Sequence, residues 1–149
     1  MIAYRITLAK WAGHLTASGR AARWNSNGRF MIYAASTRAL ACLENIVHRR
    51  SIGADSRFEV TLIEIPDDLK IKKIDKEKLP ADWQKYINYT SCQAIGDDWL
   101  KENKTAVLRV PSAVITEEYN YLLNPQHPDL SRIKAHAAER FTFDERLLK

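Results

Sequence analysis

The sequence predicts an α+β fold in a single domain, on three observations. The chain has 149 residues, which is the usual size of one domain. Segments with alternating apolar residues are mixed with segments of helical spacing, but the two kinds do not alternate as regular βαβ units. Neither a Gly-x-Gly-x-x-Gly nor a Gly-Lys-Ser/Thr sequence occurs, so the nucleotide-binding folds that carry these motifs lose their main support.

The N-terminal third predicts two strands separated by a long loop. Apolar residues at every second position predict a strand over residues 2–8. Residues 10–28 hold three of the five glycines and are expected to form a loop. Residues 30–34 are almost entirely apolar, which is typical of a strand that is covered on both faces.

A helix is predicted to begin at Ser36, which is a good N-cap residue. Its apolar residues recur at helical spacing, at Ala39, Leu40, Leu43, Ile46 and Val47. Arg49 and Arg50 suit the last turn, and Gly53 follows the expected end. Glu44 lies at the margin of the apolar stripe, where a carboxylate that faces the core would need a partner.

The middle of the chain predicts a strand, an exposed segment and a second helix. Residues 58–62 alternate and predict a half-buried strand that stops at Pro66. The lysine-rich segment 69–79 is expected to be an exposed edge or loop. Residues 90–93, Thr-Ser-Cys-Gln, predict a capping box for a helix that extends to about residue 102.

The C-terminal third predicts short strands between chain breaks. Residues 106–110 predict a strand interrupted at Pro111, so that Ser112 begins the next segment. Asn124-Pro125 and His127-Pro128 break the chain again. Phe141 and Phe143 indicate a last short strand.

Charge is distributed unevenly along the chain. The net charge is +5, but residues 1–57 carry nine Lys/Arg against Glu44 and Asp55, a local net charge of +7. The first 43 residues contain six Lys/Arg and no acid, and Glu44 ends that run. Such an uneven distribution of charge indicates a solvated basic face, an anion site or, less often, a nucleic-acid surface. A lone carboxylate among cations would stay ionised and could stabilise a positive charge in a substrate.

The sequence gives no sign of a membrane protein, a secreted protein or a metal-binding protein. No apolar run approaches the ~18 residues of a membrane span, and the N-terminus lacks a signal-peptide core, so we expect a cytoplasmic protein. Cys42 and Cys92 are fifty positions apart and belong to no ligand-spaced cluster. We therefore expect neither a metal site nor a disulfide.

Five motifs in order along the chain resemble the RES domain. They are Tyr4-Arg5-Ile6, then Gly19-Arg20-Ala21-Ala22-Arg23-Trp24-Asn25 with Gly28, then Ile32-Tyr33-Ala34-Ala35-Ser36 followed by Ala41 and Leu43-Glu44, then Val110-Pro111-Ser112-Ala113, and finally Asn120-Tyr121-Leu122-Leu123-Asn124-Pro125 with His127-Pro128. The family takes its name from signature Arg, Glu and Ser residues. The matches run from residue 4 to about residue 128 of the chain.

The resemblance implies a toxin of a bacterial toxin–antitoxin pair, with a fold similar to that of diphtheria-toxin-like ADP-ribosyltransferases. RES proteins destroy NAD+, and ADP-ribosylation or phosphorolysis is assigned to some members. NAD+ would be the substrate, with no true cofactor. An Xre-type antitoxin would block the active-site cleft and contact DNA for the pair. The segment 69–79 and the C-terminal tail are candidate contacts for the antitoxin or for a second toxin copy in a homodimer.

Carried over by position, the resemblance implies Arg23, Tyr33, Glu44 and Ser112 as the catalytic and NAD+-binding residues. Glu44 would stabilise the cationic ribose, Arg23 would hold the pyrophosphate, and Tyr33 would stack on the nicotinamide. Ser112 would contact the ribose or orient Glu44. Arg20 is the alternative phosphate contact, and we favour Arg23 because it directly precedes Trp-Asn. Taken singly, each residue is more often structural: Arg23 a solvated loop arginine, Tyr33 a core tyrosine, Glu44 a helix-surface charge or a partner of His48, and Ser112 a turn cap. Their joint match to one family favours the functional interpretation.

Three functions remain open at this stage. The first is an NAD+ glycohydrolase that uses water as acceptor. The second is an ADP-ribosyltransferase that modifies a protein or nucleic acid; many transferases carry an acid two residues before the catalytic glutamate, and Cys42 in that position weakly disfavours arginine-specific transfer. The third is a non-enzymatic nucleic-acid-binding module, although no helix-turn-helix spacing or RNA-binding aromatic motif occurs.

Overall fold

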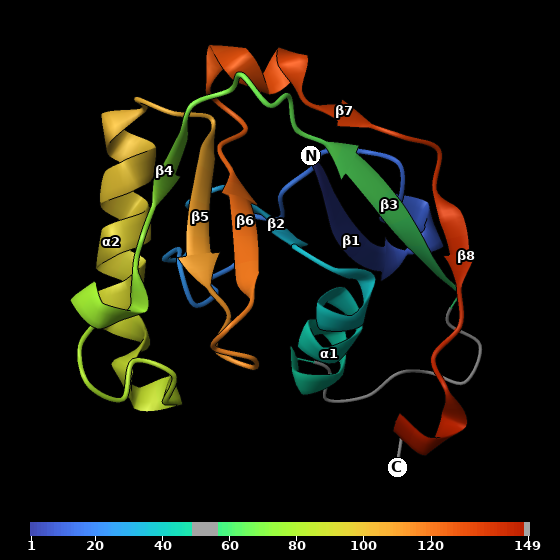
Figure 1. Cartoon of the computed structure of the whole chain (residues 1–149), viewed down its shortest axis with the longest axis horizontal. Coiled ribbons are helices and arrows are strands. Elements are labelled where there is room, and N and C mark those ends of the chain that lie inside the picture. Colours follow the sequence, from blue (N-terminus) through green and yellow to red (C-terminus); the bar gives the residue numbers. More distant parts are fainter. Residues whose placement is uncertain (49–56, 148–149) are drawn as a thin grey trace.

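The computed structural model describes residues 1–48 and 57–147, and these form a mixed sheet with two helices (Figure 1). The strand order in the eight-stranded sheet is β4-β5-β6-β2-β1-β3-β7, and β8 also pairs with β3. The strands are β1 (Ile2–Leu8), β2 (Ile32–Ala35), β3 (Phe58–Glu64), β4 (Ile71–Lys73), β5 (Val107–Pro111), β6 (Tyr119–Leu123), β7 (Lys134–Ala135) and β8 (Glu139–Phe141). The α-helices are α1 (Arg38–His48) and α2 (Tyr89–Glu102). The predicted α+β class is therefore confirmed.

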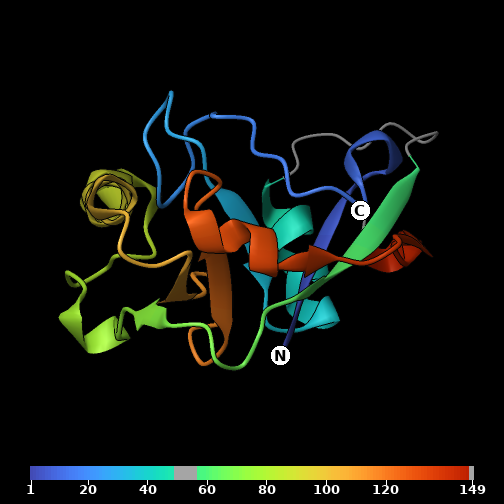
Figure 2. The same ribbon diagram turned by 90° about the horizontal axis from the view of Figure 1, so that it is seen from above.

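Both helices cover the same face of the sheet. Helix α1 packs on β1, β2 and β3, and a core cluster forms where Leu40 and Ala41 meet Ile6, Ala35 and Val60. Helix α2 packs on β5 and β6, where buried Cys92 and Trp99 meet Leu108, Val110 and Leu122. Seen from above, α2 lies at the β4–β5 end of the sheet and α1 nearer the middle (Figure 2). Because β2 lies between these two packing regions, residues on its helix-covered face can reach both.

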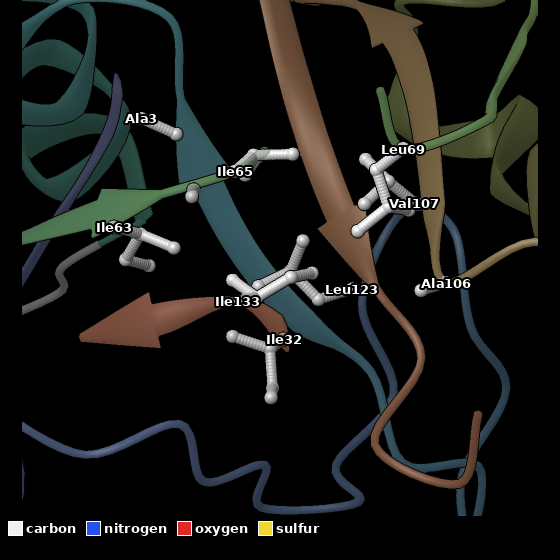
Figure 3. Packing of buried hydrophobic residues seen from close by; sticks show 10 residues of the cluster. Ala3, Ile32, Ile63, Ile65, Leu69, Ala106, Val107, Leu123 and Ile133 are labelled. Atoms are coloured by element: carbon white, nitrogen blue, oxygen red, sulfur yellow. The ribbon is translucent and has the colours of Figure 1, made fainter. Parts of the chain in front are cut away.

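The opposite face of the sheet carries a separate hydrophobic cluster (Figure 3). Ile32 and Ala34 of β2 lie in it with Ile63, Val107, Leu123 and Ile133. Leu15, Ala17 and Leu130 pack against this cluster. Strand β2 is thus covered on both faces, as its apolar sequence predicted, although it begins at Ile32 and not at residue 30.

The two helices begin differently from the prediction. The backbone N–H of Leu40 donates to Oγ1 of Thr37 (3.0 Å), so Thr37 caps α1, while the N–H of Ser36 donates to the carbonyl of Tyr119 (3.0 Å). The predicted capping box of α2 is wrong, because no side chain caps that helix and Gln93 donates to the carbonyl of Ala22 (2.8 Å). The predicted roles of Arg49, Arg50 and Gly53 lie outside the described residues.

The strands of the middle and C-terminal parts are largely as predicted. Strand β3 covers the predicted segment and pairs antiparallel with β1 along its whole length. The lysine-rich segment contributes the short edge strand β4, parallel to β5. Strand β6 was not predicted, although it joins β5 to β2 in the middle of the sheet. The last strand, β8, contains Phe141, whereas Phe143 lies beyond it and packs on Phe58.

The loop between β1 and β2 is fixed against α2. The side-chain amide of buried Asn25 donates to the carbonyls of Arg20 and Arg29 (2.8 and 2.9 Å). The Ser26 hydroxyl and backbone N–H both donate to the carboxylate of Asp97 in α2 (2.5 and 3.1 Å). Gly96 gives the loop room, since a Cβ there would lie 1.8 Å from the carbonyl oxygen of Trp24. These contacts set the position of residues 22–24 relative to the sheet.

In the part of the chain that the structure describes, neither helix is long and apolar enough to cross a membrane.

Candidate active site

A cavity of about 300 Å³ lies on the helix-covered face, which is within the range of small-molecule sites. Its walls come from β1, β2, α1, β6 and the loop before β2. The described lining residues are Tyr4, Arg5, Ile6, Ala22, Arg23, Trp24, Tyr33, Ala34, Ala35, Ala41, Glu44, Asn45, His48, Ala113 and Asn120. Glu44 is the one carboxylate among them.

Glu44 projects from α1 into this cavity, and its side chain is 19% exposed. Its Oε1 accepts hydrogen bonds from Oγ of Ser112 (2.8 Å) and Nδ2 of Asn120 (2.6 Å). Its Oε2 lies 3.3 Å from Nε2 of His48, one helical turn further along. The carboxylate therefore has the partners that its position beside the apolar stripe requires.

Ser112 is fully buried and its hydroxyl has one available direction for its proton. The backbone N–H groups of Val114 and Ile115 both donate to Oγ (3.0 and 3.1 Å), which occupies its two lone pairs. The hydroxyl proton is then left for Oε1 of Glu44. Ser112 thus caps the turn after Pro111 and holds Glu44 at the same time, whereas its contact with the ribose stays a prediction.

The surroundings of Glu44 favour its ionised form. Burial alone would raise the pKa of this carboxyl. Hydrogen bonds from His48, Asn120 and Ser112 outweigh burial, so the pKa of Glu44 lies below its ordinary value. The cavity therefore holds a fixed negative charge at neutral pH.

Tyr33 of β2 lines the cavity, and its hydroxyl is engaged. The hydroxyl donates to Oδ1 of Asn25 (2.7 Å) and accepts from the backbone N–H of Trp24 (3.1 Å). Burial raises the pKa of Tyr33 well above its ordinary value, so the phenol stays neutral. The ring thus ties the loop to the sheet and is held in one orientation beside the cavity.

Arg23 lines the cavity, but part of its guanidinium contacts the segment before α2. Nη1 donates to the carbonyl of Trp83 (2.7 Å) and Nη2 to that of Gln84 (2.8 Å). The guanidinium carbon lies 4.2 Å from the centroid of the Tyr89 ring, a cation–π contact. Arg20 is not among the lining residues, so of the two predicted phosphate contacts only Arg23 borders the cavity.

The structure also places three residues at the site beyond the four that the resemblance implied. Asn120 and His48 contact the Glu44 carboxylate directly. Arg5 of β1 lines the cavity and donates to the carbonyls of His14 and Thr16 (3.2 and 2.8 Å), and burial lowers the pKa of its guanidinium. Arg5 and Asn120 occur in the motifs of the resemblance, and His48 follows Glu44 by four residues on the helix. His48 was already a candidate partner of Glu44 and Asn120 a lower-ranked candidate to brace the site, whereas only its motif could have singled out Arg5.

Within residues 1–48 and 57–147, no group of three or more His, Cys, Asp or Glu side chains is arranged to hold a metal ion.

Of the four predicted site residues, the structure brings Glu44, Tyr33 and Arg23 to one cavity, and Ser112 is buried behind the carboxylate of Glu44.

The RES domain model matches residues 2–144 of the chain. The chain belongs to the RES domain family. A relative from Sphingobium sp. (strain YBL2), the Prs ADP-ribosylating toxin, is 37% identical over 129 residues, which are 85% of this chain and 80% of the relative. Toxin Res of Yersinia enterocolitica is 33% identical over 153 residues, covering 99% of both chains. By this similarity over its whole length, the chain is a RES-domain toxin.

The fold of this RES protein also occurs in a solved structure. The crystal structure of the MbcT-MbcA toxin-antitoxin complex of M. tuberculosis contains a chain that superposes with a TM-score of 0.78. The match covers 95% of this chain and 84% of the other, at 18% sequence identity. At that identity the likeness concerns the fold, and it agrees with the α+β arrangement of sheet and helices.

Proposed function

We propose that this RES toxin cleaves the nicotinamide–ribose bond of NAD+ and acts as an NAD+ glycohydrolase. The observation that carries the proposal is the Glu44 carboxylate, which Ser112 and Asn120 hold in an ionised state within a cavity of small-molecule size. NAD+ is the substrate in this proposal, and no cofactor is needed.

One fixed carboxylate meets the requirement of this reaction. When the bond breaks, the electron pair leaves with nicotinamide, which departs as a neutral molecule and needs no acid. Water then bonds to the anomeric carbon of the ribose and releases a proton to solvent, which gives ADP-ribose. Positive charge develops on the ribose, and Glu44 stabilises that charge electrostatically. Ordinary glycosidases need two carboxyl groups, because their leaving group must be protonated. Glu44 is the single carboxylate among the described lining residues.

Arg23 and Tyr33 would orient two parts of the substrate, its pyrophosphate and its nicotinamide. A guanidinium has five N–H donors, and Arg23 uses one on Trp83 and one on Gln84, so further donors are left for the pyrophosphate. The two carbonyls hold the plane of the guanidinium in place. Tyr33 offers its ring to the nicotinamide while its hydroxyl stays fixed by Asn25.

The test is release of nicotinamide from NAD+ by the purified chain. We expect Glu44→Gln, which keeps the shape of the side chain and removes its charge, to reduce the rate at least 100-fold. Gln126→Glu, an isosteric exchange outside the cavity, is the matched control and should leave the rate unchanged. Full activity of the Glu44→Gln variant would contradict the mechanism.

A second candidate function is transfer of ADP-ribose to a macromolecule. It is supported by the name of the relative from Sphingobium, the Prs ADP-ribosylating toxin. The same four residues would serve, because only the acceptor changes. NAD+ labelled in its adenylate part, incubated with cell lysate, separates the two reactions. Label bound covalently to protein or nucleic acid favours transfer, and label recovered only as free ADP-ribose favours hydrolysis.

We also propose the cellular setting of this activity. The toxin acts in the cytoplasm and binds an antitoxin of the Xre type, with no contact to nucleic acid except through that antitoxin. Support comes from the fold match to a chain of a toxin-antitoxin complex. We also propose that the fold is similar to that of diphtheria-toxin-like ADP-ribosyltransferases, and that two copies of the toxin form a homodimer within the complex with the antitoxin. Expression of the chain alone should lower cellular NAD+ and slow growth, and co-expression of the antitoxin should restore both.

A further inference from the structure

The two oxygens of the Glu44 carboxylate are held in different ways. Oε1 accepts from Ser112 and Asn120, which come from the end of β5 and from β6. Oε2 has one donor among residues 1–48 and 57–147, the imidazole of His48. A carboxylate offers about four lone-pair positions, two on each oxygen. Within the described part of the chain, the position that is left lies on Oε2.

The donors of Oε1 are fixed. Ser112 is fully buried, and its lone pairs are occupied by the N–H groups of Val114 and Ile115. Asn120 lies on β6, opposite Ala35 of β2 in the sheet. Oε1 is consequently the oxygen that attaches Glu44 to the sheet, and Oε2 is the one available to a substrate.

His48 stands beside that available oxygen. Its Nε2 lies 3.3 Å from Oε2, it borders the cavity, and its side chain is 55% exposed. To donate to Oε2 the imidazole carries a proton on Nε2, whether it is neutral or charged. Because the imidazole is more than half exposed, its pairing with Glu44 is expected to contribute little to the stability of the folded protein. Its effect is therefore expected on the orientation of the carboxylate more than on folding.

We propose that His48 is a positioning residue for the reaction: it holds Oε2 of Glu44 so that the acceptor position not taken by a donor among residues 1–48 and 57–147 points into the cavity. This inference rests on the proposed function and deepens it. Ser112 and Asn120 hold one oxygen of the carboxylate and His48 holds the other, so hydrogen bonds to both oxygens restrain its rotation. The substrate then meets an oxygen already directed towards the ribose, which needs no reorientation as the bond breaks.

A second histidine–glutamate pair provides a matched control. Nε2 of His136 lies 2.8 Å from Oε2 of Glu64, and the His136 side chain is 48% exposed. Neither residue lines the cavity. The two pairs have the same chemistry and similarly exposed imidazoles, although the Glu64 side chain is 45% exposed and that of Glu44 19%. They differ in their relation to the site.

The experiment compares the wild type with His48→Ala, His48→Gln and His136→Ala. For each protein, kcat and KM for nicotinamide release are measured, and thermal unfolding is followed by circular dichroism. We expect His48→Ala to lower kcat about tenfold, the effect of one hydrogen bond to a charged group, with KM changed by about twofold at most. His48→Gln supplies an amide N–H donor and should recover most of kcat. His136→Ala should match the wild type, and the His48 variants should unfold within a few degrees of it.

Each outcome decides the matter. Wild-type kcat in His48→Ala would overturn the inference and leave the proposed function intact. A His48→Gln variant as slow as His48→Ala would overturn it as well, because the donor would not be the cause. A rise in KM with unchanged kcat would assign His48 to substrate binding instead. A folded wild-type protein that releases no nicotinamide would overturn the proposed function and the inference together.

Discussion

The hydroxyl of Ser112 lies 2.8 Å from Oε1 of Glu44, although the two residues are 68 positions apart in the chain. Ser112 follows β5 directly, and Glu44 lies in the middle of α1. The hydrogen bond thus connects the helix over β1 and β2 to the region where β5 turns towards β6. The position of the candidate catalytic carboxylate depends on that distant turn.

Replacing Ser112 with alanine should affect both stability and activity. The change removes a donor from Glu44 and leaves the N–H groups of Val114 and Ile115 without their acceptor. We expect about 1–3 kcal/mol lower free energy of unfolding, measured by urea denaturation. The rate of nicotinamide release should fall more than tenfold at a temperature where the variant is folded. Ser131→Ala, which removes an exposed hydroxyl on the Pro128 carbonyl, is the control and should change neither quantity.

The stability of the protein should depend on pH through Glu44. Its pKa in the folded state lies below the ordinary value, so the unfolded chain binds the proton more tightly. The ionised carboxylate therefore stabilises the fold fully above about pH 4.3, the usual glutamate pKa, and this contribution is lost as the pH falls through the lower folded value. The difference in unfolding free energy between wild type and Glu44→Gln should accordingly shrink below about pH 4.3. A difference that grows towards acid pH would show that burial, and not hydrogen bonding, dominates at this group.

The sequence allowed a good prediction wherever local pattern decides the structure. Glu44 was expected on a helix, beside an apolar stripe and in need of a partner, and it has that place and three partners. The identity of the partners depends on β6, whose polar and aromatic first residues hide the strand pattern. Its place is set by pairing with β5 and β2, which is a long-range property.

The residues that cap the two helices could not be predicted from local sequence either. Ser36 and Thr37 are adjacent hydroxyl residues, and either could have capped α1. Thr37 is the residue that caps, whereas Ser36 continues the pairing with β6 through its N–H, which donates to the carbonyl of Tyr119. Gln93 fits a capping box in sequence, yet its amide contacts Ala22, 71 residues away. Tertiary contacts thus override local signals at both helix starts.

Gly96 should be the least replaceable residue of α2. A Cβ there would lie 1.8 Å from the carbonyl oxygen of Trp24 and 2.8 Å from its carbonyl carbon, so the loop and the helix would have to separate. We expect Gly96→Ala to lower the free energy of unfolding by about 1–3 kcal/mol, despite the better helix propensity of alanine. Asp98→Ala on the exposed side of the same helix should change it by less than about 0.5 kcal/mol. Equal stability of Gly96→Ala and wild type would mean that the loop does not seat on α2 as described.

Arg23 and Arg20 provide a direct test of which arginine serves the substrate. Arg23 borders the cavity and its guanidinium is braced by Trp83, Gln84 and the Tyr89 ring, whereas Arg20 lies outside the lining. We expect Arg23→Ala to raise KM for NAD+ or lower kcat/KM by about 100-fold, the effect of a lost charge-assisted pair of hydrogen bonds. Arg23→Lys should remain well below wild type, because an ammonium cannot reproduce the planar fork that reaches two carbonyls and a phosphate at once. Arg20→Ala should retain wild-type kinetics. If Arg20→Ala were the slower variant, the pyrophosphate would have to lie outside the cavity that contains Glu44, and the two residues would no longer belong to one site.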